Sequence, residues 1–597
     1  MYKKDPIADV LSQMHSPYLV GFSSYMWNIE YNLALAAAVK AQYPDCRIVF
    51  GGPQIPDDTE YLERYGYIDI LLHGEGEQTF YELLCALQDG TPLDTVANLS
   101  YRDGAQIVRT QKRLYKDLSQ FPSAYASGLL DSIVDDPANR DMEFCTVLET
   151  NRGCPYGCIY CTWAGTEDRF RPFPMERIQA DLDWMSRHKI VYCICADSNF
   201  GILERDMQIA DYIVSLKKET GYPIKFETTA AKNKNDTVFR ICQKLESADM
   251  NCGISLAVQS FSPTVLDNIG RKNISVQDFK KQMTQYREAG MSTYTDLILG
   301  LPGETFESFC DGLFYAIESG QHNSVNVHPC EVLPNTVLYQ QQTRQKYNIK
   351  TVTSTLCQFH SKRTAEDSFG SRSDVIVSTD TLSAAEWRDA MRLASVVQSY
   401  HSFGILRFLA VYLRRAQGMS YAAFYRSLYR WIETQSVTVK GILDTVCAQV
   451  DSFSKGKGTL SFYDERVSDA YLQFKEGLFL YTVLAWEDFW TEIESFLRPL
   501  FVRQDHFTDL LVYQKNIILR PSVTDCIIAL EYDWHRYFEN ICELSPVQPN
   551  RLRHTLRISC CGTENLQEYT KNILWHGKRT NKMIGKNVQY IDKEAGR

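Results

Sequence analysis

This sequence has no excess of positive charge, few long apolar runs and no apolar core of a secretory signal in its first residues. Its 63 Lys and Arg residues are outnumbered by 73 Asp and Glu residues, which gives a formal net charge of -10. Phosphate contacts require a basic surface, so this balance argues against nucleic acid as the main partner. No stretch of about 18 uncharged apolar residues occurs, and we therefore expect no membrane span.

The N-terminus, MYKKDPIADVLSQMHS, lacks the apolar core of a secretory signal. We find no low-complexity tract and no repeat beyond an alternation of strands and helices. These absences predict a cytoplasmic protein.

Eighteen cysteines could suggest a disulfide framework, but most of them stand singly inside apolar runs. Such cysteines behave as small buried hydrophobes in a reducing compartment. We interpret six of them in this way: Cys46, Cys85, Cys145, Cys242, Cys252 and Cys447. Only one group of cysteines has the spacing of a ligand set.

The chain is long enough for two to four domains, with 597 residues of which 44% are hydrophobic and 23% charged. We predict an α/β domain over 1–110, a linker over 111–141, a second α/β domain over 142–345 and a mainly helical region over 346–597. The fold class is therefore α/β with a helical C-terminal part.

The first domain alternates between strand and helix signals, which implies a parallel sheet. Its predicted strands are 17–24, 47–53 and 68–77, and a helix is predicted over 32–42. A hairpin over 99–108 turns at Asp103-Gly104, a favoured hairpin dipeptide. Residues 110–140 are polar and irregular, as in a linker.

The second domain carries six predicted strands, separated by helical stretches such as 175–188. The apolar runs are nearly continuous, which is typical of parallel strands buried on both faces. We expect a partial (β/α)₆ barrel, in which chemistry gathers at the C-terminal ends of the strands. The strands are predicted at 145–153, 191–199, 223–231, 252–260, 292–302 and 324–333.

The C-terminal region shows aromatic-rich helical periodicity over 381–418, 420–435 and 469–501. From about residue 505 the predicted elements are shorter and mixed. We interpret the aromatic helices as a hydrophobic core and a substrate lid rather than as a cofactor site.

The segment ETNRGCPYGCIYCTWAG (149–165) contains the pattern C-x3-C-x2-C directly after a predicted strand. Thiolates from Cys154, Cys158 and Cys161 on one short loop can ligate three irons of a [4Fe-4S] cluster and leave the fourth iron open. The open iron can chelate the amino and carboxylate groups of S-adenosylmethionine (SAM). Electron transfer then cleaves its C–S bond and releases a 5′-deoxyadenosyl radical.

Two other interpretations of these cysteines were weighed. A zinc site normally offers four ligands, often as C-x2-C pairs, and no second pair follows nearby. Chance clustering is disfavoured by the strand-end position and by Gly153 and Gly157, which suit a loop that wraps closely around a cluster.

On these residues, the segment 145–340 resembles the radical SAM superfamily. The signature of that family is C-x3-C-x-φ-C with φ aromatic, and this chain has Tyr160 at that place. The run VLDNIGRKN and the turn LPGET (301–305) also resemble the family. For each polar residue at a strand end, helix capping is the alternative role. The resemblance implies SAM contacts from Tyr160, Trp163, Asp197, Asn199, Glu227, Thr228, Gln259, Ser260 and Arg271.

The patterns VGFSSYMWN, IVFGGP and DILLHGEGEQTF resemble the cobalamin-binding domain that precedes many radical SAM domains. That domain is a doubly wound sheet, and ligands of such sheets bind at the carboxyl ends of the strands. The alternative is that the glycines only form strand-to-helix turns. The resemblance implies cobalamin contacts from Ser23, Tyr25, Gly51, Gly52, Gly74 and Glu75.

The first domain departs from this pattern in two respects. A complete domain of the kind has about five such strands, and only three precede the linker, so we expect an incomplete domain. No D-x-H-x-x-G motif occurs, so no histidine ligand for cobalt is evident. Either the chain is a truncated version, or the domain keeps its scaffold without cobalamin.

Three functions follow as hypotheses. The first is a cobalamin-type radical SAM C-methyltransferase, or a related modifying enzyme, acting on a natural product, peptide or cell-surface precursor. The second is a radical SAM epimerase, dehydrogenase or cyclase that works without cobalamin. The third is a non-catalytic binding or scaffold protein, against which the intact cysteine group speaks.

The expected partners are a small-molecule, peptide or sugar substrate and an electron donor such as flavodoxin or ferredoxin. The sequence identifies no residue for a proton or hydrogen-atom step. His328 and His360 are candidates for acid–base chemistry, but a lone histidine is more often structural.

Overall fold

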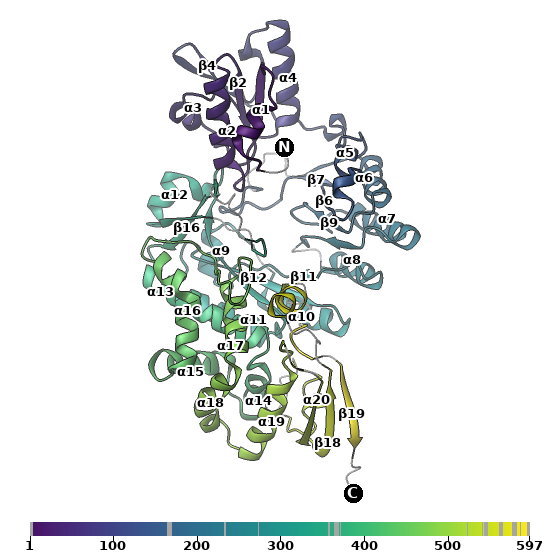
Figure 1. Ribbon diagram of the computed structural model, residues 1–597, viewed down its shortest axis with the longest axis vertical. Coiled ribbons are helices and arrows are strands. Elements are labelled where there is room, and N and C mark those ends of the chain that lie inside the picture. Colours follow the sequence, from purple (N-terminus) through teal and green to yellow (C-terminus); the bar gives the residue numbers. More distant parts are fainter. Residues whose placement is uncertain are drawn as a thin grey trace.

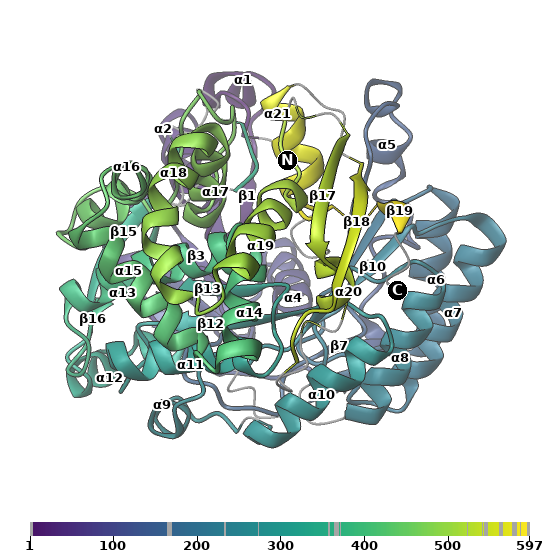
Figure 2. The same ribbon diagram turned by 90° about the horizontal axis from the view of Figure 1, so that it is seen from below.

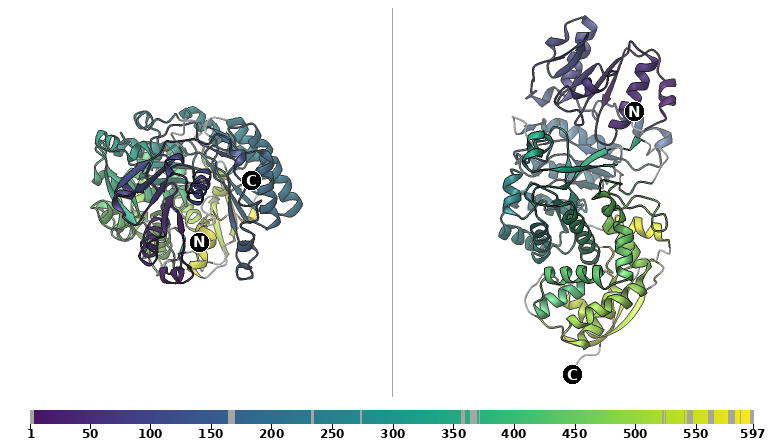
Figure 3. Two further views of the ribbon diagram at one scale, coloured as in Figure 1. Left: turned by 90° about the horizontal axis from the view of Figure 1, so that it is seen from above. Right: turned by 90° about the vertical axis from the view of Figure 1, so that its left-hand side faces the viewer.

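The molecule is elongated, with a mixed sheet at the N-terminal end and an antiparallel sheet near the C-terminal end (Figures 1 and 3). Between them lie two parallel sheets and a large group of helices. This computed structural model describes residues 4–163, 170–231, 235–272, 274–355, 359–362, 369–370, 372–521, 523, 525–539, 541, 547–559, 565–575, 582–585 and 587–593.

The N-terminal sheet has the strand order β1-β2-β3-β4-β5. The first three strands are parallel, and β4 and β5 form the predicted antiparallel hairpin. All five predicted elements of this domain are therefore confirmed. The elements are α1 (Ile7–Ser12), β1 (Leu19–Ser23), α2 (Ile29–Gln42), β2 (Arg47–Gly51), α3 (Glu60–Arg64), β3 (Ile70–Leu72), α4 (Gly76–Asp89), β4 (Leu99–Asp103) and β5 (Gln106–Arg109).

Apolar side chains cover both faces of this sheet. Phe50 and Leu71 pack in a core with α2 and α3, whereas Val49 and Ile70 pack in a second core with Leu83 of α4. Because neighbouring residues of a strand point to opposite faces, the apolar runs of β2 and β3 serve both cores. Helices on the two faces leave the carboxyl ends of β1, β2 and β3 at one edge.

The six predicted strands of the second domain form two separate parallel sheets, ordered β10-β9-β6 and β11-β12-β13. In the described residues no ladder joins β10 to β11. Helices α6, α7 and α8 flank the first sheet, and the C-terminal helices lie on the opposite side of the molecule (Figure 2). The strands are β6 (Cys145–Leu148), β9 (Tyr192–Cys195), β10 (Lys225–Glu227), β11 (Ile254–Ser255), β12 (Thr293–Leu299) and β13 (Val325–Pro329).

The sheet of β6, β9 and β10 with its helices is the first half-barrel, and the sheet of β11, β12 and β13 with its helices is the second. The helices of these two half-barrels alternate with the strands, as predicted. Side-chain caps begin several of them: Ser262 and Ser275 accept backbone N–H groups, and Thr305 forms a capping box with Ser308. The helices are α6 (Met175–Arg187), α7 (Arg205–Thr220), α8 (Asn235–Ser247), α9 (Pro263–Asn268), α10 (Val276–Glu288) and α11 (Phe306–Glu318).

In the sheet of β6, β9 and β10 one face is open to solvent, which corrects the prediction of burial on both faces for these strands. Val147 of β6 is 53% exposed and Ile194 of β9 is 39% exposed, whereas the alternate residues Leu148 and Cys193 are fully buried under the helices. Cys145, predicted to be buried, is exposed on the same open face. The exposed face belongs to the first sheet, whereas the central strand β12 of the second sheet has no exposed residue.

The other cysteine predictions are confirmed in part. Cys46, Cys242 and Cys447 are buried, whereas Cys85 and Cys252 are partly exposed. None of the described cysteines forms a disulfide.

The C-terminal region packs on the second half-barrel. Its aromatic helices share one continuous hydrophobic core with β12, β13 and α11, to which Trp387, Tyr400 and Phe489 contribute. The predicted helices are confirmed, and the shorter elements after residue 505 include an antiparallel sheet of β17 (Cys526–Tyr532), β18 (Arg551–Ile558) and β19 (Val588–Lys593). The helices are α13 (Ala384–Val397), α14 (Arg407–Gln417), α15 (Tyr421–Thr434), α16 (Thr438–Phe453), α17 (Phe474–Leu484), α18 (Trp486–Leu497) and α19 (Gln504–Ile517).

A further antiparallel sheet lies between the second half-barrel and these helices in the sequence. Its strands are β14 (Glu331–Val332), β15 (Lys350–Thr355) and β16 (Arg372–Ser378), in the order β14-β16-β15. No helix in the described parts of the chain combines the length and the apolarity needed to cross a bilayer.

The turn after β12 is built around a buried acid. Glu304 is 1% exposed and accepts a hydrogen bond from Ser308 at 2.9 Å, while Ser260 Oγ lies 3.5 Å from the same oxygen. Burial raises the pKa of Glu304 to about 8. The LPGET turn therefore carries a protonated carboxyl at neutral pH.

The turn after β2 depends on Gly52, whose φ is +106°. A Cβ atom there would lie 2.6 Å from the backbone oxygen of Ser24, so Gly52→Ala meets both strain and a clash. We expect protection from native-state hydrogen exchange in β1 and β2 to fall by about 2 kcal/mol or more. The control is Gly66→Ala, where a Cβ meets nothing within 4 Å; equal losses in the two variants would contradict this.

The buried acid also predicts a pH dependence. Between its usual pKa of 4.5 and about 8, Glu304 holds a proton in the folded chain but not in the unfolded chain. The folded state then binds more protons, so the free energy of unfolding falls as pH rises through this range. Glu304→Gln removes this contribution, and urea unfolding at pH 5, 6.5 and 8 should show a flatter profile than wild type. The exposed neighbour Glu307→Gln is the control, and an unchanged slope in Glu304→Gln would contradict the assignment.

Candidate functional site

The three cysteines lie on the loop that follows the short strand β7 (Asn151–Arg152). Cys158 is buried, whereas Cys154 and Cys161 are partly exposed. The amide of Cys161 donates to the carbonyl of Cys158 at 3.1 Å, which makes a tight turn between these two thiols. The three side chains thus belong to one short, folded loop.

Backbone contacts hold this loop against the second half-barrel. The amide of Ile159 donates to the carbonyl of Ile269 at 3.1 Å, and the carbonyl of Ile159 accepts from the amide of Leu338 at 2.8 Å. Gly270 approaches so closely that an added Cβ would lie 3.1 Å from the oxygen of Gly157. The cysteine loop therefore connects both half-barrels.

Asp197, predicted to contact SAM, is 1% exposed and directs its carboxylate at the start of the cysteine loop. It accepts from the amide of Thr150 at 2.8 Å and from Asn151 Nδ2 at 2.7 Å, and further bonds come from Thr150 Oγ1 and the Asn151 amide. Burial raises the pKa of Asp197, although these bonds oppose the shift. In this geometry Asp197 fixes the turn between β6 and β7, and its contact with SAM stays a prediction.

Asn199 contacts the first cysteine. Its Nδ2 donates to Cys154 Sγ at 3.3 Å, while its Oδ1 is buried and has no hydrogen-bond partner among the residues that the structure describes. The neighbouring Ser198 donates to the carbonyl of Gly153 at 2.9 Å. Buried polar atoms are normally paired, so an unpaired acceptor beside a ligand thiol fits a bound molecule that offers a donor group.

Arg271 and Tyr160 meet beside the second cysteine. Arg271 is 5% exposed, and its Nη1 donates to Tyr160 Oη at 3.2 Å and lies 4.0 Å from Cys158 Sγ. Burial raises the pKa of Tyr160, although the Arg271 charge opposes this. The structure thus brings two of the predicted SAM contacts together at the cysteine loop.

The other predicted SAM contacts lie at later strand ends. Glu227 accepts a hydrogen bond from Tyr192, and Thr228 follows it at the end of β10. Gln259 has a φ of +66° and bridges to β12 through its backbone, and Ser260 is buried beside Glu304. Trp163, 47% exposed, ends the described part of the cysteine loop.

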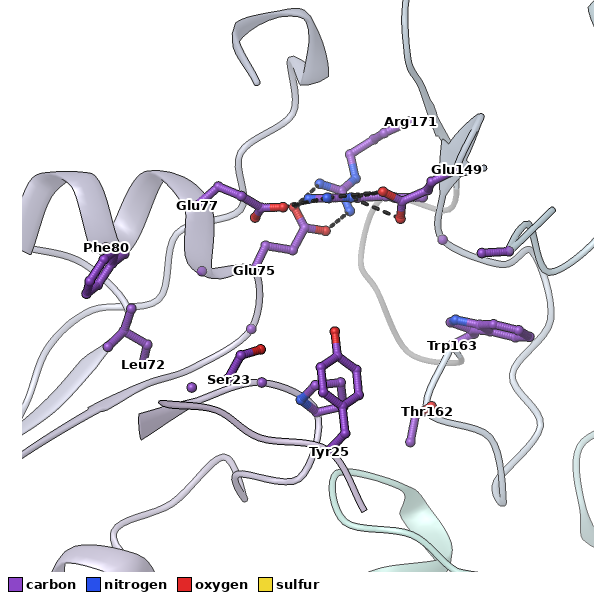
Figure 4. Close-up of a pocket in the computed structure, with 18 of the residues that line it drawn as sticks. Ser23, Tyr25, Leu72, Glu75, Glu77, Phe80, Glu149, Thr162, Trp163 and Arg171 are labelled. Atoms are coloured by element: carbon purple, nitrogen blue, oxygen red, sulfur yellow. Dashed lines mark hydrogen bonds and ion pairs between the residues drawn. The ribbon is translucent and has the colours of Figure 1, made fainter. Parts of the chain in front are cut away.

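A cavity of about 700 Å³ lies between the N-terminal sheet and the cysteine loop. All six residues predicted to contact cobalamin line it, from the carboxyl ends of β1, β2 and β3. The opposite wall comes from the radical SAM-like domain and includes Gly153, Thr162 and Trp163. Figure 4 shows Tyr25 and Trp163 on opposite sides of the space.

The lining of this cavity fits a large, flat cofactor. Its volume lies within the range of about 300–1,000 Å³ that is usual for cofactor and ligand sites. Gly51, Gly52, Gly74 and Gly76 expose backbone to a ligand, and Tyr25 adds an exposed aromatic ring. The residues present therefore suit the corrin ring that the sequence implies.

Charged residues form the remaining wall: the sequence predicted Glu75 as a cobalamin contact but gave no role to Glu77, Glu149, Arg152 or Arg171. Arg152 pairs with Glu75, Glu77 and Glu149, and Arg171 pairs with Glu75. Figure 4 shows Arg171 among these three glutamates. Burial raises the pKa of Glu149. For Glu77 burial is the largest influence and acts in the same direction, but the hydrogen bond and charge of Arg152, with smaller contributions, together lower the pKa. The only sequence signal was position: Arg152 stands two residues before Cys154, and Glu77 belongs to the GEGE turn.

Among the residues that the structure describes, no group of three or more His, Cys, Asp or Glu side chains is arranged to hold a metal ion. The cluster ligands therefore stay a prediction from the cysteine spacing and from the folded loop.

Comparison with known proteins agrees with the sequence patterns. A family model described as the radical SAM superfamily matches residues 148–314. The 2-(S-pantetheinyl)-carbapenam-3-carboxylate methyltransferase of Streptantibioticus cattleyicolor is 34% identical over 442 residues, which are 73% of this chain and 64% of that protein. The cobalamin-dependent radical SAM methyltransferase TokK of Streptomyces tokunonensis is 33% identical over 73% of this chain and 65% of its own length. The chain spans slightly less than two thirds of both relatives.

Among solved structures, the cobalamin-dependent SAM radical enzyme OxsB, with aqua-cobalamin and SAM bound, matches with a TM-score of 0.51. The match covers 75% of this chain and 67% of OxsB at 17% identity, and it shows a shared fold. Residues 148–314 of this chain are thus a radical SAM domain, and the chain is a homologue of cobalamin-dependent radical SAM methyltransferases.

Proposed function

We propose that this protein is a cobalamin-dependent radical SAM methyltransferase that acts at a carbon atom of a small molecule. One observation carries the proposal: a single cavity has the predicted corrin contacts on one wall and the loop of Cys154, Cys158 and Cys161 beside the other. Two cofactors that must exchange a methyl group and a radical with one substrate need such proximity.

The chain would hold the two cofactors with separate sets of residues. When bound, the cluster and cobalamin supply electron transfer to SAM and a methyl group, respectively. Asn199 Oδ1 offers an acceptor for the SAM amine beside Cys154, and Arg271 orders Tyr160 over the loop. The glycine-lined floor of β2 and β3 would receive the corrin.

The inner faces of the half-barrels offer the substrate site. Val147 and Ile194 make an apolar wall, whereas Asp296 and His328 on the other sheet make a polar wall. His328 Nε2 lies 3.3 Å from Asp296 Oδ1. Burial raises the pKa of Asp296, but the His328 contact and the hydrogen bonds from Asn326 and Ser255 together lower it. A substrate with both apolar and polar groups suits these walls, and a carbapenam carboxylate, named for one relative, has this character.

The electron for SAM cleavage must come from outside the chain. We propose a small redox protein such as flavodoxin or ferredoxin as the donor.

The proposal is tested by anaerobic reconstitution with iron, sulfide and hydroxocobalamin, followed by reaction with SAM, reductant and 2-(S-pantetheinyl)-carbapenam-3-carboxylate as a probe. We expect corrin absorbance in the purified protein, with S-adenosylhomocysteine and 5′-deoxyadenosine as products. A protein that forms 5′-deoxyadenosine but retains no corrin would replace the proposal with a cobalamin-independent radical enzyme. A protein that holds no iron would indicate a binding role.

Removal of a single cluster thiol tests the ligand assignment. We expect Cys154→Ala, Cys158→Ala or Cys161→Ala to lose cluster iron and to lower reductive SAM cleavage at least about 1,000-fold, because the reaction starts at the cluster. Iron content and 5′-deoxyadenosine formation are measured. Cys85→Ala, in helix α4, is the matched control and should retain both. Full cleavage by any loop variant would disprove the assignment.

Filling the cavity tests the corrin site. Gly76 lines the cavity, and an added Cβ there meets nothing within 4 Å, so Gly76→Leu would occupy cofactor space without disturbing the backbone. We expect the affinity for hydroxocobalamin, measured by absorbance titration, to fall at least about tenfold. Gly66→Leu, outside the cavity, should bind like wild type. Unchanged binding by Gly76→Leu would place the corrin elsewhere.

A further inference from the structure

We infer that Arg152 is a positioning residue that clamps the Gly74–Glu77 turn of the N-terminal sheet against the cysteine loop. The inference rests on the proposed function, because these contacts would set the spacing between the cavity wall that would hold cobalamin and the wall beside the cysteines. The contacts themselves are independent of that function.

Arg152 binds carboxylates from both sides of the cavity. Its Nη2 donates to Glu77 Oε1 at 2.6 Å, and its Nη1 lies 3.2 Å from Glu75 Oε2. On its own side, Nε and Nη2 donate to Glu149 at 3.2 Å. The side chain is only 16% exposed, so solvent screens these interactions less than it screens surface ion pairs.

Arg171 forms a second connection between the Gly74–Glu77 turn and the opposite wall of the cavity. It donates to both oxygens of Glu75, with Nη1 at 2.9 Å from Oε2, and also to the carbonyl of Tyr115 at 2.8 Å. Its side chain is 4% exposed. Since Tyr115 lies in the segment between the two domains, Arg171 joins that segment to the same cluster.

Two aromatic rings fix the position of the Arg152 guanidinium. Its Cζ lies 5.6 Å from the ring centre of Phe121 and 5.4 Å from that of Phe173. A planar guanidinium can lie against such rings, donate to Glu77 and Glu149 and still form an ion pair with Glu75, whereas a lysine ammonium cannot reproduce this geometry. The site therefore requires arginine in particular, beyond a positive charge.

The location makes these contacts relevant to both cofactor sites. Arg152 precedes Cys154 by two residues, and Glu75 lines the cavity directly before helix α4. Removing the guanidinium would leave Glu77 and Glu149 as neighbouring carboxylates that repel each other, while Arg171 would still hold Glu75. The two walls would then be joined more weakly, and the distance between the cofactors would be less firmly fixed.

The test uses the full chain reconstituted with iron, sulfide and hydroxocobalamin. In Arg152→Gln we expect amide hydrogen exchange of residues 74–80 to rise at least about tenfold and hydroxocobalamin affinity to fall at least about tenfold. Arg152→Lys should give intermediate values. Glu77→Gln acts from the other wall, away from the cysteines, and should reproduce the increase in exchange with wild-type iron content.

The matched control is Arg113→Gln. Arg113 pairs with Glu82 of helix α4 at 3.3 Å, but this ion pair does not join α4 to the radical SAM domain. Its loss should therefore leave amide exchange at residues 74–80 unchanged. Wild-type exchange and corrin affinity in both Arg152→Gln and Glu77→Gln would overturn the inference. A wild-type protein that binds no corrin and cleaves no SAM would instead refute the proposed function, while the exchange data would still decide the role of Arg152.

Discussion

The carboxyl ends of parallel strands must all emerge at one edge of their sheet, and the molecule is arranged around this constraint. β1, β2 and β3 end at the cavity from one side, while the turns after β6 and β9 end there from the other. Loops at strand ends are free to carry glycine, cysteine and charged residues because they take no part in the ladders. Two sheets that are far apart in sequence thus supply one shared space.

Much of this arrangement could be predicted from sequence because its signals are local. The cysteine spacing of 154–161, the GGP turn and the GEGE turn each occupy a few consecutive residues at the end of an apolar strand. A parallel sheet then places such turns at one edge without further information. All six predicted corrin contacts consequently line one cavity, although their spacing in the sequence does not indicate which of them are neighbours in the fold.

The rest depended on contacts that no local pattern describes. Arg152 meets Glu75 and Glu77 across more than 70 residues of chain, and a charged residue near a strand end gives no indication of its partner. The exposure of Val147 and Cys145 could not be foreseen, because an apolar strand has the same composition whether its second face is covered or open. Asp197 was recognised as a strand-end acid, but its bonds to Thr150 and Asn151 emerge only in the folded turn.

The division of the barrel into two sheets separates its hydrophobic interior as well. The sheet of β6, β9 and β10 packs with α6 and α7 in one core, whereas β12 and β13 share theirs with the C-terminal helices. A small cluster that includes Val238, Ile254 and Tyr286 spans the boundary in the described residues, and the cysteine loop bridges it a second time through Ile159 and Tyr160. The cysteine loop is therefore a structural joint between two separate hydrophobic interiors, so a change in its fold would be felt by both halves.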